Sequence, residues 1–157
     1  MASVGDDIVL PEGLDRMTRP ELKQLYAYWD SRRNGRPMPS RADIDPLDIP
    51  RLLPFVVLVD VLNDPRDYQY RLVGTDVTES IGVNFTGTRL SESNSKKVFE
   101  RIWVDYDRAA DEHQPVYTED RVAWQGREFL RYKRIALPLS DDGEQVNMLL
   151  LGLCHEV

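Results

Sequence analysis

Hydrophobic positions repeat with a helical period in two parts of the chain. In residues 20–35 they are spaced at i, i+3, i+4 and i+7, where Leu22, Leu25, Tyr26 and Trp29 stand. This spacing predicts an amphipathic helix, and residues 18–21 read as its capping box, with a proline in the first turn. A broader apolar stripe predicts a long helix over residues 96–112.

Other stretches follow the patterns of β-strands. Residues 54–62 form a nearly continuous β-branched run, which predicts a strand covered on both faces, with the N-terminal helix on its outer side. Turn residues 63–67 separate this run from residues 68–74, so the two strands should form a hairpin. Residues 115–124, 129–139 and 145–154 predict three further strands joined by short turns. Strands joined in this way should pair antiparallel.

The centre of the chain, residues 68–90, connects a strand directly to short helical turns. Tyr68, Tyr70 and Leu72 alternate and are expected to share one face of the strand. Gly74 ends the strand, Thr75 is the expected helix N-cap, and glycines at 82 and 87 mark two turns. A strand that leads into helical turns crossing its face is typical of a cupped sheet with a small pocket.

We expect three segments: a loosely held lead-in at 1–17, the N-terminal helix and a connector at 18–53, and the main domain at 54–157. The connector is basic, with Arg32, Arg33, Arg36 and Arg41. This cluster suits a phosphate-bearing nucleotide or the acidic face of a partner. The simpler alternative is that it pairs with the nearby Asp43, Asp45 and Asp48.

Composition narrows the possible functions. The 157 residues carry a net charge of −7, which argues against a nucleic-acid or anionic-membrane binder. The single cysteine, Cys154, excludes an intramolecular disulfide and a cysteine-only zinc site, and it suits a reducing compartment. No segment approaches the roughly 20 apolar residues that span a bilayer. We therefore expect a cytoplasmic protein.

The order of these elements, and the residues that carry it, resemble the PAS domain superfamily. The similar features are YRLVGT before a short helix, GVNFTG, the long helix, a hairpin ending in RIALPL, DDG and a last apolar strand. The upstream residues W–RR–G–PMPSRADIDP make the chain similar to the small stand-alone bacterial PAS proteins. The resemblance implies an α+β fold: a five-stranded antiparallel sheet with short helices and one long helix over one face, plus the N-terminal amphipathic helix.

Members of this superfamily are sensory or protein-interaction modules, commonly dimeric, with haem, flavin, a small metabolite or nothing in the cup. Aromatic candidates for lining such a pocket are Tyr70, Trp103, Tyr106 and Tyr132, although ordinary core packing is the alternative. Among the basic strand residues we assign Arg131 to the pocket, where an inward cation would bind an anion.

The sequence requires no cofactor. His113, at the end of the long helix, is placed as the axial ligand of a haem-binding PAS domain would be, but a histidine also suits the negative end of a helix. The stretch FTGTRL has no cysteine, which excludes covalent flavin photochemistry. We find no nucleophile–base pair, metal-ligand spacing or P-loop, so we predict no catalytic residue, no metal site and no enzyme. A small cone-shaped α+β enzyme is the less favoured rival, because here two strands precede the long helix.

We therefore predict a sensory or regulatory protein that signals through contacts with a second copy or another protein. The interface residues we expect are Leu22, Leu25, Tyr26 and Trp29, packed on the outer face of the sheet and against a second copy. The alternative is an interaction adaptor with a filled core and no ligand.

Overall fold

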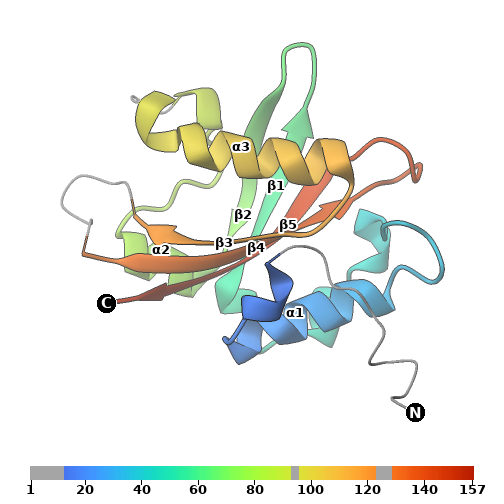
Figure 1. The fold of residues 1–157 in the computed structure, drawn as a ribbon, viewed down its shortest axis with the longest axis horizontal. Coiled ribbons are helices and arrows are strands. Elements are labelled where there is room, and N and C mark those ends of the chain that lie inside the picture. Colours follow the sequence, from blue (N-terminus) through green and yellow to red (C-terminus); the bar gives the residue numbers. More distant parts are fainter. Residues whose placement is uncertain (1–12, 93–95, 123–128) are drawn as a thin grey trace.

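The computed structural model describes residues 13–92, 96–122 and 129–157. Their framework is one antiparallel sheet in the order β2-β1-β5-β4-β3 (Figure 1). The strands are β1 (Val56–Leu62), β2 (Asp67–Val73), β3 (Val116–Arg121), β4 (Arg131–Leu139) and β5 (Met148–Glu156). The predicted α+β class, the five strands and the β1–β2 hairpin are confirmed.

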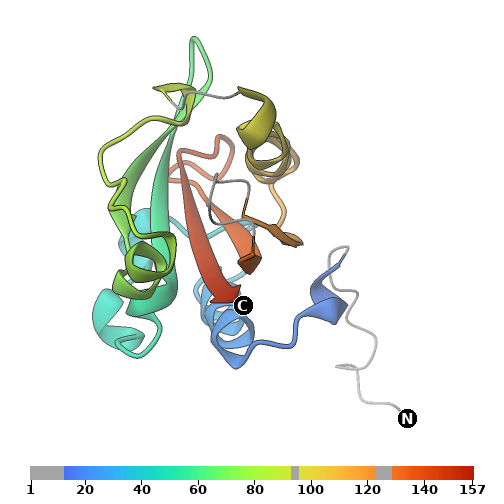
Figure 2. The ribbon, with the colours of Figure 1, turned by 90° about the vertical axis from the view of Figure 1, so that its left-hand side faces the viewer.

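Helices cover both faces of the sheet. The long helix α3 (Lys96–Glu112) lies over one face, which we call the inner face, and α1 (Pro20–Ser31) lies across the opposite, outer face (Figures 1 and 2). The short helix α2 (Thr75–Ile81) packs against β5 and against the 3₁₀ turn Leu53–Phe55. We call the space between α3 and the inner face the cup.

The apolar stripe of α1 is buried against the outer face. Leu22, Leu25 and Trp29 are exposed by only 0%, 1% and 1%. The helix lies so close to β5 that a Cβ atom added to Gly152 would stand 2.8 Å from Leu22 Cδ2. Glycine at this position is therefore what allows α1 to lie directly on the strand.

The caps of two helices differ from expectation. Arg19 is the N-cap of α1 and no side chain caps it, because Glu21 pairs with the Arg19 side chain instead of closing a capping box. The N-cap of α2 is Gly74 rather than Thr75. A complete capping box occurs instead in the connector, where Ser40 and Asp43 enclose the 3₁₀ turn Arg41–Asp43.

One face assignment in β2 is wrong. The pairing with β1 shifts by one residue, because Val59 opposes Tyr70 whereas Leu58 opposes Leu72. Such an irregularity moves the following side chain to the other face of the strand. Leu72 therefore leaves the face of Tyr70 and is 43% exposed.

Part of the lead-in that we expected to be loosely held packs against the main core. Leu14 and Met17 are 2% and 8% exposed and belong to the main core. The remainder of the lead-in, residues 1–12, lies outside the described residues, and so do residues 125–128, where we predict the turn between the strands at 115–124 and 129–139.

Candidate functional site

A buried ion pair stands at the centre of the cup. Arg134, on β4, is 3% exposed and donates from Nη2 to Asp105 Oδ2 on α3 at 2.6 Å. Asp105 also accepts from Thr118 Oγ1 on β3 at 2.8 Å. The pair therefore joins the long helix to two strands through a single carboxylate.

Three tyrosines surround this pair. The hydroxyl groups of Tyr70 and Tyr106 lie 3.1 Å apart, and the guanidinium carbon of Arg134 lies 5.2 Å from the Tyr106 ring centre and 5.3 Å from that of Tyr132. Burial raises the pKa of all three hydroxyl groups, most of all that of Tyr70. We call the six residues the Arg134 cluster: Tyr70, Asp105, Tyr106, Thr118, Tyr132 and Arg134.

The cluster corrects the assignment of the inward arginine. Arg131 is exposed, and Arg134 is the arginine that points into the cup. Neighbouring residues of a strand face opposite sides, so Arg131 cannot share the inner face with Tyr132, whereas Arg134 does. The anion that Arg134 holds is supplied by the chain itself, as Asp105.

The guanidinium of Arg134 stays charged in spite of its burial. Burial lowers the pKa of this group, but Tyr106, Tyr132 and Asp105 outweigh burial and leave the pKa above its usual value. A charge removed from water is tolerated where a partner charge and hydrogen bonds compensate it. The Arg134–Asp105 pair is thus close to neutral as a unit.

Trp103, the remaining pocket candidate, lies at another place in the cup. Its ring meets Tyr68 edge-on at 5.3 Å, and Tyr68 meets Tyr106 at 5.1 Å. Arg66, from the β1–β2 turn, pairs with Asp107 and Asp111 on the same helix at 3.4 and 2.9 Å. Trp103 therefore belongs to the contact that attaches the hairpin to α3.

Besides Arg134, two members of the cluster, Asp105 and Thr118, were not predicted from the sequence. Asp105 follows Ile102 by three residues and precedes Ala109 by four, so it stands within the apolar stripe of α3. An acidic residue at such a position is the signal that could have identified it, because a buried carboxylate requires a partner. Thr118 gave no comparable signal.

The other candidates lie away from the cup. His113 follows the last residue of α3, is partly exposed and has a φ of 58°.

The interface candidates lie on α1. Leu22, Leu25 and Trp29 are buried against the sheet of their own chain, so the predicted packing on the outer face is present. Among the four interface candidates, Tyr26 retains partly exposed surface. Contact with a second copy stays a prediction.

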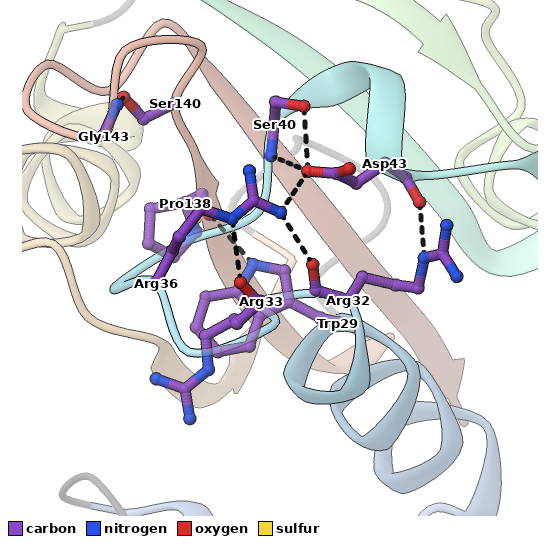
Figure 3. A network of polar contacts seen from close by, with 9 residues as sticks. All are labelled: Trp29, Arg32, Arg33, Arg36, Ser40, Asp43, Pro138, Ser140 and Gly143. Carbon is purple, nitrogen blue, oxygen red and sulfur yellow. Dashed lines mark hydrogen bonds and ion pairs between the residues drawn. The ribbon is translucent and has the colours of Figure 1, made fainter.

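The basic connector is internally paired (Figure 3). Arg36 Nη2 lies 2.6 Å from Asp43 Oδ2, and Arg32 Nε donates to the Asp43 carbonyl oxygen at 2.8 Å. Trp29 Nε1 donates to the Pro138 carbonyl oxygen on β4 at 2.9 Å and so fixes the end of α1 beside the connector. These contacts favour a structural role for this cluster over a phosphate site.

We expect the contribution of Asp43 to stability to depend on pH. Hydrogen bonds from Ser40, chiefly from its backbone N–H, and from Arg36 lower the pKa of the Asp43 carboxyl to about 2. Because the folded pKa lies below the unfolded value of about 4, the contribution is complete above pH 4 and is lost as pH falls towards 2. Asp43→Asn should therefore melt below the wild type at pH 7, and the difference should shrink between pH 4 and 2.5. A difference that is constant over this range would contradict the assignment.

Two surface depressions lie outside the cup. One, of about 360 Å³, is lined by the β1–β2 turn, Asp107 and Asp111. The other, of about 390 Å³, lies at the ends of β3, β4 and β5 and includes Tyr132 in its lining.

Within the described residues, no group of three or more His, Cys, Asp or Glu side chains is placed to hold a metal ion. In the same residues, no helix has the length and apolar character needed to cross a membrane.

Comparison with known proteins identifies the fold family. The family model described as "PAS domain" matches residues 17–154, which covers α1, α2, α3 and the sheet except for the last two residues of β5. No curated protein and no solved structure matched the chain. The match covers well over half of the sequence and agrees with the five-stranded sheet and its helices. The chain therefore belongs to the PAS domain family.

Proposed function

We propose that this chain is a cytoplasmic regulatory PAS protein that senses a small molecule in the cup and passes the change on by contact with a second copy or another protein. PAS domains generally have sensory or regulatory rather than catalytic roles. The observation that carries the proposal is the Arg134 cluster, because a buried and partly polar cup is suited to recognising a polar molecule.

The cluster also suggests how a signal would leave the cup. Asp105 and Tyr106 are consecutive residues of α3, and their partners lie on β2, β3 and β4. A ligand that rearranges these contacts would change how α3 is held on the sheet. We propose that this change reaches a partner through the outward side of α3, where Val104 is 51% exposed.

The adaptor hypothesis is the second candidate, and one observation favours it. Tyr70 and Tyr106 meet directly across the cup, and Arg134 lies between the rings of Tyr106 and Tyr132. Large side chains that meet in this way resemble a filled core. An adaptor would use the Arg134 cluster to fix α3 in one position, and it would need no ligand.

Native mass spectrometry of freshly purified protein, combined with a visible absorption spectrum, separates the two functions. A sensor should show an added mass that is released on denaturation, and a haem spectrum would identify that mass as haem. A colourless protein that remains at its sequence mass, or at twice that mass, after incubation with a metabolite extract would contradict ligand sensing and favour the adaptor.

A further inference from the structure

Two buried side-chain nitrogen atoms on the inner face have no hydrogen-bond partner among the residues that the structure describes. They are Arg134 Nε and His155 Nδ1. Buried polar atoms in folded proteins are nearly always partnered, and each exception points to strain or to a group that binds there. Arg134 is also among the least exposed polar residues of the fold.

The pairing of β4 with β5 brings the two atoms into one region. Tyr132 stands directly opposite His155, and Arg134 stands opposite Leu153. Arg134 and His155 are therefore diagonal neighbours on one face, a relationship in which the two residues are about 7–8 Å apart. The Tyr132 ring lies between them, 5.3 Å from the Arg134 guanidinium carbon and 6.5 Å from the His155 ring.

The surroundings of this region are apolar. Tyr132 packs with Val122 and Leu130, and the partly buried Ile81 and Leu153 close the same cluster. Two polar atoms beside an aromatic ring, with aliphatic walls, match the usual composition of a small-molecule site.

The charges of the region select the class of ligand. Asp105 already neutralises Arg134. Burial lowers the pKa of His155, although Asp76 opposes the shift, and so favours the uncharged imidazole. An anionic ligand would compete with Asp105 for the guanidinium and leave a carboxylate buried without a partner, which is costly. An uncharged ligand leaves the ion pair intact and needs only an oxygen atom that accepts from Nε–H.

We propose that Arg134, Tyr132 and His155 form a binding site for a small uncharged molecule that carries an aromatic ring and a hydrogen-bond-accepting oxygen, as in an aromatic amide. The oxygen accepts from Arg134 Nε–H, a polar group of the ligand reaches His155 Nδ1, and the ring takes the place of Tyr132 against the aliphatic wall. This inference rests on the proposed sensing function and specifies the chemistry of its ligand.

Benzamide and benzoate test the inference, because they share a ring and differ in charge. The readout is the ¹H–¹⁵N signal of the Arg134 Nε–H group in the full chain. This signal is assigned as the one that disappears in Arg134→Lys, a variant that keeps a cation beside Asp105. Benzamide should shift this signal in a saturable manner, and benzoate should not. Arg134→Lys lacks this signal, so its benzamide binding is measured by calorimetry; it should be weaker on the order of tenfold or more, because the hydrogen bond from the charged Nε–H donor is lost. The matched control, Arg131→Lys on the exposed side of β4, should leave binding unchanged.

The possible outcomes separate this inference from the proposed function. A shift with benzoate alone would overturn the uncharged class of ligand and leave sensing in the cup in place. No shift with either probe, in a protein that carries a co-purified molecule, would show that the ligand binds elsewhere. No shift with either probe, in a protein that also gains no mass after incubation with a metabolite extract, would overturn both the inference and the sensing function.

Discussion

Replacing Arg134 by methionine is expected to lower the free energy of unfolding by about 3–5 kcal/mol, because the Asp105 carboxylate would remain buried without its cation. Asp105 is 8% exposed, so water cannot replace the guanidinium fully. For a domain of this size, a loss of this magnitude corresponds to a melting temperature about 6–20 °C lower. Urea unfolding followed by tryptophan fluorescence measures the loss directly, provided that the slope of the transition is unchanged.

The double variant Arg134→Met/Asp105→Leu tests the cause. It removes both charges, so most of the stability lost in the single variant should return. Arg131→Met is the matched control on the same strand, and it should stay within about 0.5 kcal/mol of the wild type because the side chain is exposed. If Arg134→Met alone unfolds like the wild type, or if the double variant is no more stable than the single one, the ion pair is not what holds α3 on the sheet.

Much of the fold could be predicted because it depends on periodicity. The stripe of α3 repeats over several turns, and the observed helix has the predicted bounds, Lys96–Glu112. The β1 run and the turn after it are local signals too, and their hairpin forms as expected. Helix N-caps were less predictable, since Arg19 and Gly74 act as N-caps without a side-chain hydrogen bond.

The cup was harder to predict because it depends on register. Tyr70, Tyr106 and Tyr132 were identified from their residue type and do come together. The choice between Arg131 and Arg134 instead required knowing which strand positions point inward, and a shift of one residue exchanges the two faces. Asp105 could be placed in the cup only by asking what a carboxylate does within an apolar stripe.

The role of α1 also depends on information that periodicity lacks. An aromatic stripe predicts that a helix is covered, but it does not say what covers it. Here a glycine at position 152 lets the helix lie against β5, and the outer face of the same chain covers Leu22 and Leu25. Any contact with a second copy must therefore use other surface, such as that of Tyr26.

Trp29→Ala is expected to lower the free energy of unfolding by about 3–5 kcal/mol, because it leaves a large cavity under α1. Trp29 is 1% exposed, and its ring also lies beside the guanidinium of Arg33, at 5.0 Å. Trp29→Phe should cost less, since it keeps most of the apolar contact and loses the hydrogen bond to the Pro138 carbonyl, worth about 1–3 kcal/mol if that oxygen stays unpaired.

Gln24→Ala, on the exposed side of the same helix, is the control and should leave stability within about 0.5 kcal/mol. Light scattering on each variant distinguishes the two roles of the helix. A large loss of stability in Trp29→Ala at an unchanged oligomeric mass is what the burial of this residue predicts. A variant that unfolds like the wild type but has a smaller mass would instead assign Trp29 to an interface between copies, and would contradict its packing on the sheet of its own chain.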